Sequence, residues 1–171
     1  MAQTASVLPA IAHLNKRRIV LASGSPRRKE ILGNLGLNFE VIASTFPENL
    51  DKLSMNADTY VLETAIAKGC EVHQRTQSAV NGQMTISADT VIAHKSRILE
   101  KPRNREHAVE ILRALSGGVH QVLTAVVVVY GLDPADQRTP LYATSVQTTE
   151  VEFAELSEEM IEAYVATGEP M

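Results

Sequence analysis

The sequence predicts an α/β or α+β fold in which helices flank a mixed, largely twisted sheet with antiparallel parts. Apolar runs typical of buried strands alternate along the chain with amphipathic helical patterns. Two long extended segments, 119–132 and 142–153, follow each other late in the chain. The 171 residues are 44% apolar, which is enough for a hydrophobic core and favours a single domain.

The first strand and helix are expected on either side of a short glycine-containing turn. Residues 18–22 form a compact apolar run, which breaks at Ser23-Gly24-Ser25. Ser25 is the expected N-cap, Pro26 suits the first helical position, and Gly36 ends the helix. The apolar stripe of this helix consists of Ile31, Leu32 and Leu35. A second strand is predicted over 37–43.

The middle of the chain continues with a loop, a longer helix and a strand. Residues 44–56 are polar, and an amphipathic helix is predicted over 57–73. A polar connection over 74–83 leads to a strand over 84–93. A turn and a short return over 98–102 follow.

The last third contains two capped helices and the two long strands. Asn104 caps a helix with apolar residues at i, i+3, i+4 and i+7, which Gly117 and Gly118 terminate. Segment 119–132 is β-branched and is the clearest strand of the chain. Ser157 caps a final helix, whose inward side is expected to consist of Ile161, Tyr164 and Val165.

Composition excludes several classes of protein. A formal net charge of −4 argues against nucleic acid and anionic membranes as partners. No apolar stretch reaches the ~18 residues that a membrane span needs. One cysteine, Cys70, favours a reducing compartment, so we expect a cytoplasmic protein. Residues 1–17 are expected to be a flexible lead-in and 18–171 the folded domain.

The densest chemical signal is the turn 23–28. A glycine-broken connection lets backbone amides approach an anion, and the helix N-terminus adds a partial positive charge. Ser23 and Ser25 add hydroxyl groups, while Arg27 and Arg28 oppose the helix dipole unless a negative group binds there. A capped helix with two solvated arginines would account for the same residues.

Other candidates are two carboxylates and two lysines. Asp89 interrupts an apolar strand. Its carboxylate either binds a ligand at the end of the strand or accepts hydrogen bonds from nearby backbone amides. Considered singly, Lys68 and Lys101 are accounted for as surface lysines whose stems lie along apolar neighbours. Glu48, considered alone, is accounted for as a solvated acid. Together with the turn 23–28, the set suits metal-assisted attack on a polyphosphate.

In these residues the sequence resembles the Maf-like family of nucleoside triphosphate pyrophosphatases. The matching segments run in order from Arg18 to the end of the chain. They are Leu21-Ala-Ser-Gly-Ser-Pro-Arg-Arg28, Ala88-Asp-Thr90, Leu99-Glu-Lys-Pro102, Leu115-Ser-Gly117, His120-x-Val122-x-Thr124 and Gly168-Glu-Pro170. The resemblance implies a Maf/ITPase-like fold with a central nucleotide-binding cleft. It also implies hydrolysis between the α and β phosphates to a nucleoside monophosphate and pyrophosphate, and a homodimer.

The resemblance implies roles for individual residues. Asp89 would be the proton acceptor, and Glu48 and Asp89 would bind Mg²⁺ or Mn²⁺. Lys68 and Lys101 would act on the phosphates together with the turn residues Ser23, Ser25, Arg27 and Arg28. Arg27 and Thr90 match specificity positions of the subgroup that acts on dTTP and UTP, with modified pyrimidine nucleotides as additional substrates; the role would be nucleotide-pool housekeeping.

The match departs from the family at its end. After Gly-Glu-Pro the family continues with Asp-Lys-Ala-Gly and a Gly-x-Gln segment, whereas this sequence stops at Met171. We therefore expect a domain that lacks the usual C-terminal segment. The alternative function is a non-catalytic variant that binds a nucleotide or pairs with a full-length partner.

Overall fold

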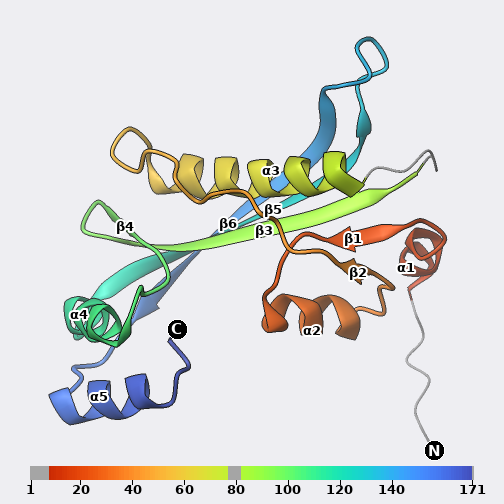
Figure 1. Cartoon of the computed structure of the whole chain (residues 1–171). Coiled ribbons are helices and arrows are strands. Elements are labelled where there is room, and N and C mark those ends of the chain that lie inside the picture. The colour runs from red at the N-terminus through yellow and green to blue at the C-terminus, as the bar shows by residue number, and fades with distance from the viewer. Residues whose placement is uncertain (1–7, 77–81, 171) are drawn as a thin grey trace, which may run out of the picture. The chain divides into compact units, whose positions relative to one another are not determined.

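The computed structural model describes residues 8–76 and 82–170 (Figure 1). The helices are α1 (Pro9–Leu14), α2 (Pro26–Asn34), α3 (Ala57–Thr76), α4 (Arg105–Leu115) and α5 (Glu158–Ala166). The strands are β1 (Ile19–Leu21), β2 (Glu40–Val41), β3 (Met84–His94), β4 (Arg97–Leu99), β5 (Val119–Leu132) and β6 (Pro140–Glu152). Within these residues they form a six-stranded sheet in the order β2-β1-β3-β5-β6, with β4 paired to β3. Parallel and antiparallel pairs both occur, so the predicted mixed α/β sheet is confirmed.

The chain is organised as two compact units, and several elements contribute to both. The first unit comprises Met1–Asn49, Leu62–Ala88 and Val126–Ser145. The second unit comprises Leu50–Val61, Asp89–Ala125 and Val146–Met171. One boundary, between residues 49 and 50, falls in a loop, and the others fall inside α3, β3, β5 and β6. A single domain over 18–171 stays a prediction.

In the first unit, β1 lies between two parallel partners. Leu21 pairs with Val41 on β2 and with Ile86 on β3. All three residues of β1 are buried, as expected for the strand that leads into the turn 23–28. The strand predicted over 37–43 is shorter than expected, because a ladder with the three-residue β1 offers few further partners.

Two features of the first unit go beyond the sequence analysis. The apolar stripe of α2 is largely exposed: Ile31 is 59% exposed, Leu35 is 53% exposed, and α2 contains no buried residue. The stretch 1–17 contains the six-residue helix α1 in its described part, and its flexibility stays a prediction. Pro9 supplies the fixed φ of a first helical turn there, which explains why this short segment can start a helix.

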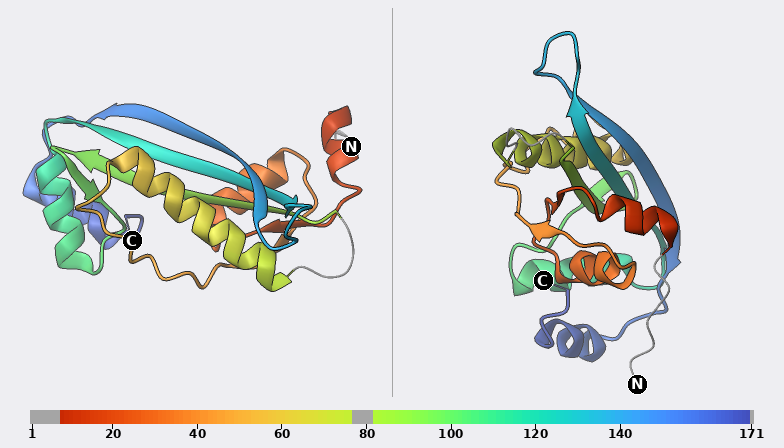
Figure 2. Two further views of the ribbon diagram at one scale, coloured as in Figure 1. Left: turned by 90° about the horizontal axis from the view of Figure 1, so that it is seen from above. Right: turned by 90° about the vertical axis from the view of Figure 1, so that its right-hand side faces the viewer.

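Helix α3 lies along β3 (Figures 1 and 2) and extends to Thr76, three residues past its predicted end. The Thr76 hydroxyl donates to the Val72 carbonyl over 2.6 Å, which satisfies an acceptor of the last turn. Part of the predicted connection, 77–81, lies outside the described residues. Residues 133–139 join β5 to β6 in a hairpin turn that projects away from α3 in Figure 1.

In the second unit, α4 and α5 pack side by side (Figures 1 and 2). Their shared core consists of Ala108, Val109, Leu112, Ile161 and Val165, with Phe153 and Leu156 against it. Both predicted caps are confirmed, because the side chain of Asn104 accepts from the His107 amide and that of Ser157 from the Met160 amide. Tyr164, expected to face inward, is 46% exposed, since Ile161 and Val165 are the residues of α5 that enter the core shared with α4. Among the described residues, none of the helices is long and apolar enough to span a bilayer.

Candidate functional site

The turn after β1 folds around the hydroxyl of Ser23. Ser23 is 8% exposed, and its Oγ accepts from the Ser25 amide over 3.3 Å. Ser25 occupies the predicted N-cap position with an extended backbone, but its side chain does not cap the helix. Pro26 follows at the first helical position, and the first turn contains no acidic residue. The positive end of the helix dipole is therefore not neutralised by a carboxylate of its own turn.

Arg28 connects this turn to Ala88, the last residue of β3 that belongs to the first unit. Its Nη1 donates to Ser23 Oγ over 3.1 Å and to the Ala88 carbonyl over 2.8 Å. Both acceptors are neutral oxygens, so these bonds orient the guanidinium without neutralising its charge. Arg27 is exposed, whereas Arg28 is half-buried. These two bonds hold the guanidinium of Arg28 in a defined direction.

Glu48 and Lys68, both predicted from the sequence, form an ion pair. Oε1 of Glu48 lies 2.7 Å from Nζ of Lys68. The Lys68 side chain is 12% exposed, whereas that of Glu48 is 52% exposed. Lys68 is therefore no snorkelling surface lysine: most of its side chain is shielded, and it meets a carboxylate there.

The second unit contains the other three predicted residues. Asp89 directly follows Ala88 on β3 and is 7% exposed. Thr90 is exposed, and its Oγ1 lies 3.0 Å from Oγ1 of Thr124 on β5. Asp89 and Thr90 are thus consecutive residues of β3, and Thr90 contacts the neighbouring strand β5. Lys101 is exposed and follows the short strand β4.

A cluster next to Lys101 was missed by reasoning from the sequence. Glu100 accepts from the hydroxyl of Tyr60 on α3, and its other carboxylate oxygen pairs with Lys52. Nζ of Lys52 also lies 5.9 Å from the centre of the Tyr60 ring. Tyr60 is completely buried. A tyrosine on the apolar face of a helix needs a hydrogen-bond partner for its hydroxyl. The position of Tyr60 in the predicted helix could therefore have indicated a polar partner there.

Histidine and cysteine do not offer a competing chemistry. Among residues 8–76 and 82–170, no group of three or more His, Cys, Asp or Glu side chains could hold a metal ion. Burial raises the pKa of the Cys70 thiol, which disfavours the thiolate that a nucleophile requires. Burial also lowers the pKa of His73 and of His120, which favours their neutral forms.

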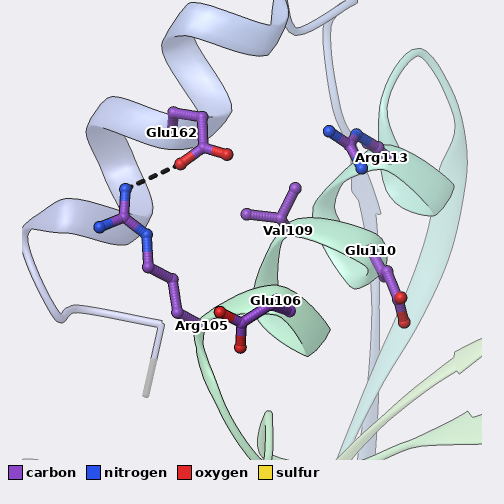
Figure 3. A pocket seen from close by; sticks show the side chains of 6 residues that line it. All are labelled: Arg105, Glu106, Val109, Glu110, Arg113 and Glu162. Carbon is purple, nitrogen blue, oxygen red and sulfur yellow. Dashed lines mark hydrogen bonds and ion pairs between the residues drawn. The ribbon is translucent and has the colours of Figure 1, made fainter.

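A groove of about 210 Å³ lies elsewhere in the second unit, between α4 and α5 (Figure 3). Its lining residues are Arg105, Glu106, Val109, Glu110, Arg113 and Glu162. Arg105 spans it toward Glu162, with 2.8 Å between Nη2 and Oε2. The groove contains none of the predicted site residues, and its lining carries charges of both signs.

Comparisons with known proteins identify relatives over most of the chain. The family model of the Maf-like proteins matches residues 18–171. A "probable bifunctional dTTP/UTP pyrophosphatase/methyltransferase protein" of Homo sapiens is 43% identical over 166 residues, which are 95% of this chain and 27% of that protein. The dTTP/UTP pyrophosphatases of Acetivibrio thermocellus and Bacillus anthracis are 40% and 41% identical, covering 90% and 91% of this chain and 74% of each relative.

The lengths of these relatives differ from that of the chain. It spans about a quarter of the human relative and about three quarters of the two bacterial ones. A crystal structure of a nucleoside-triphosphatase (dITP/XTP pyrophosphatase) from Mycobacterium abscessus aligns with a TM-score of 0.43 and 14% identity, over 79% of this chain and 73% of that one. On the family match and the identity to the two bacterial enzymes, the chain belongs to the Maf-like family.

Proposed function

We propose that the chain hydrolyses nucleoside triphosphates, dTTP and UTP above all, to a nucleoside monophosphate and pyrophosphate. The observation that carries this proposal is the turn 23–28, in which a buried serine hydroxyl and a half-buried guanidinium adjoin a helix N-terminus that lacks an acidic residue. Backbone amides, a hydroxyl and a guanidinium are the groups that bind phosphate oxygens. The names of the relatives at 40–43% identity support the same reaction.

In this proposal the residues of the turn bind the phosphates. Hydrogen bonds to Ser23 Oγ and to the Ala88 carbonyl orient the guanidinium of Arg28 beside the turn. Ser25 and Arg27 lie at the start of α2, where an anion is favoured by the dipole. Lys68 and Lys101 add ammonium groups that stabilise the charge developing on the leaving pyrophosphate.

The remaining step is the proton transfer from water. Asp89 takes the proton while the water oxygen forms its bond to the α-phosphorus. The bond from this phosphorus to the bridging oxygen breaks, and the electron pair leaves with pyrophosphate. Asp89 is 7% exposed, so its carboxyl group is largely shielded from bulk water.

The donor set fits a divalent cation that binds together with the nucleotide. Mg²⁺ is usually held by one or two carboxylates plus substrate phosphates, and Glu48 and Asp89 are the two carboxylates that we propose as ligands. The absence of a larger cluster among the described residues agrees with a cation that depends on phosphate oxygens. Mg²⁺ or Mn²⁺ would supply Lewis-acid polarisation of the phosphates.

Proposals on the base, on modified substrates and on the oligomer rest on the family resemblance, and one on the compartment rests on the cysteine content. Arg27 and Thr90 select the pyrimidine base, and modified pyrimidine nucleotides are additional substrates, which makes the role the cleansing of nucleotide pools. The protein acts as a homodimer. Its single cysteine, Cys70, suits the reducing cytoplasm, where we place the reaction.

The test is pyrophosphate release from UTP, dTTP and 7-methyl-GTP with Mg²⁺ or Mn²⁺. Turnover of UTP or dTTP that falls at least about 100-fold in Asp89→Asn would support the proposal. Asp58→Asn, at an exposed position in the first turn of α3, is the matched control and should retain full activity. Retained hydrolysis in Asp89→Asn would overturn the role of this residue. No turnover by the folded, unaltered chain would favour the alternative of a non-catalytic nucleotide-binding variant.

A further inference from the structure

The loop 43–48, which follows β2, lies along one face of α3 in reverse order. Lys68, Glu71 and Arg75 are spaced at i, i+3 and i+7 on this helix, so they share one face. At one end of this face, Arg75 Nη2 donates to the Ala43 carbonyl over 2.9 Å. About two helical turns earlier on α3, Nζ of Lys68 lies 2.7 Å from Oε1 of Glu48. The loop therefore runs from the Arg75 end of the face to the Lys68 end.

Glu71 holds the middle of this loop through both oxygens of its carboxylate. Oε2 accepts from the Ser44 hydroxyl over 2.8 Å and from the Thr45 amide over 3.1 Å. Oε1 accepts from the Thr45 hydroxyl over 3.1 Å and from Arg75 Nε over 2.6 Å. Burial alone would raise the pKa of Glu71, but the hydrogen bonds from these three residues together lower it. The side chain is therefore a carboxylate at neutral pH, which can accept from all of these donors.

This anchor shortens the tether that carries Glu48. Residues 42–51 contain neither helix nor strand. The Ile42 amide donates to the Leu21 carbonyl of β1 over 3.0 Å, and this bond fixes the start of the loop. From Ile42 the chain could extend about 20 Å to Glu48, whereas from Thr45 it could extend about 10 Å. The bonds of Thr45 to Glu71 thus roughly halve the reach of the Glu48 backbone.

The ion pair with Lys68 does not by itself fix Glu48. The Glu48 side chain is 52% exposed, and water competes well for an exposed carboxylate. The position of this carboxylate therefore depends on the backbone that carries it. A backbone that is already ordered saves the ordering cost that would otherwise be subtracted from the binding of a ligand.

We propose that Glu71 is a positioning residue for the cation of the proposed reaction. It holds the loop 43–48 against α3 and so presents the Glu48 carboxylate to the cation that accompanies the nucleotide. In this role Glu71 contacts neither the cation nor the nucleotide and acts through Glu48. The role, which rests on the proposed function, adds a residue that no motif of the sequence indicated.

The test measures Mn²⁺ binding to the full chain by electron paramagnetic resonance. The α,β-imido analogue of UTP is present, which resists cleavage between the α and β phosphates, and the same mixture without protein is the reference. Glu71→Ala removes the anchor and should weaken Mn²⁺ binding at least about threefold, because effective concentration falls steeply as a tether lengthens. Glu63→Ala removes the same charge from an exposed position of α3 and should bind Mn²⁺ as the unaltered chain does.

Two further variants separate the anchor from the charge of Glu71. Ser44→Ala with Thr45→Val removes both hydroxyl donors without a change of charge, and it should also weaken Mn²⁺ binding. Glu71→Gln keeps one acceptor oxygen for the Ser44 hydroxyl and the Thr45 amide, so it should retain most of the affinity. Thermal melting checks that each variant is folded. If Glu71→Ala does not fold, the loop variant replaces it in every comparison.

A double variant shows whether Glu71 acts through Glu48. Glu48→Gln alone should weaken Mn²⁺ binding at least as much as Glu71→Ala does. Once Glu48 is replaced, the addition of Glu71→Ala should cause no further loss, because the ligand that it positions is gone. A second loss of the same size in the double variant would reveal a general structural effect and would overturn the positioning role.

Pyrophosphate release from UTP by the unaltered chain, measured in parallel, reports separately on the proposed function. Turnover together with equal Mn²⁺ affinities of Glu71→Ala and Glu63→Ala would overturn the positioning role alone. The expected losses of Mn²⁺ binding without turnover would support the positioning role and overturn the pyrophosphatase. If the unaltered chain does not bind Mn²⁺, both the cation site and the positioning role are overturned.

Discussion

Gly69 of α3 sits against Ser87 of β3 so closely that a β-carbon at position 69 would lie 2.5 Å from Ser87 Oγ. The same hydroxyl donates to the Ala65 carbonyl over 2.7 Å, one helical turn before Gly69. Ser87 is completely buried. The contact therefore fixes how α3, which carries Lys68, lies along β3 in the first unit.

Gly69→Ala is expected to destabilise the fold by about 1–3 kcal/mol, because the Ser87 hydroxyl must move and lose its acceptor. Urea unfolding measures this change. The matched control is Gly33→Ala on α2, where a β-carbon meets nothing within 4 Å. Adding Ser87→Ala should recover part of the loss, since it removes the atom in closest contact. Equal unfolding free energies for Gly69→Ala and Gly33→Ala would contradict the close approach.

Arg28→Lys should raise the KM for UTP about tenfold and leave the thermal stability nearly unchanged. One guanidinium nitrogen donates to both Ser23 Oγ and the Ala88 carbonyl, and a lysine ammonium lacks the planar fork that binds phosphate oxygens in pairs. Steady-state kinetics checks this expectation. Lys29→Arg, at the next and exposed residue, is the control and should behave like the unaltered chain. An unchanged KM in both variants would rule out Arg28 as a phosphate ligand.

Tyr60→Phe should cost about 2 kcal/mol of unfolding free energy, because a buried hydroxyl that donates to the Glu100 carboxylate is removed. Chemical denaturation followed by circular dichroism gives this value. Tyr130→Phe is the control, since Tyr130 is 46% exposed and its change should be close to zero. If Glu100 also positions the adjacent Lys101, the Tyr60 variant will show a lower kcat for UTP. A loss of the same size in both variants would argue against the buried contact.

Stability should fall as the pH drops below about 6.5. His73 is 1% exposed, its Nδ1 lies 2.9 Å from Thr85 Oγ1, and burial lowers its pKa from the ordinary value of 6.5. The unfolded chain then binds the proton first, so the unfolding free energy decreases between pH 6.5 and the lower pKa of the folded state. Above pH 6.5 this contribution does not vary with pH.

The measurement is urea unfolding at pH 7.5, 6.5 and 5.5. His73→Gln keeps a polar partner for Thr85, but its side chain does not titrate. The unfolding free energy of this variant should therefore change less with pH, by up to about 1 kcal/mol per pH unit. The exposed His13→Gln should keep the slope of the unaltered chain. Identical slopes for all three proteins would show that the proton is not taken up at His73.

Local signals allowed some of these features to be predicted. The caps Asn104 and Ser157 were predictable because the capping side chain bonds to an amide three residues away. The turn 23–28 was predictable because its serines, proline and arginines are contiguous. Asp89 was singled out because a charge in an apolar strand is rare.

Other features depend on partners that the local sequence does not specify. Tyr60 and Glu100 are 40 residues apart, and the residues around either one do not indicate that it contacts the other. The stripe of Ile31 and Leu35 predicted a buried face, but an amphipathic pattern does not tell whether another element covers it. The length of β2 was set by its short neighbour β1 and not by its own apolar run.

The absence of any buried residue in α2 has a consequence for the phosphate site that we propose at its start. A helix without a buried residue opens to solvent at low free energy, so its amide hydrogens exchange early. Its order then depends on the bonds at its first turn, where Arg28 reaches Ser23 and Ala88. A bound phosphate would add bonds at the same end of the helix. Hydrogen exchange of the amides in 26–34 would therefore slow when a nucleotide binds. The net binding free energy would be reduced by the cost of ordering the helix.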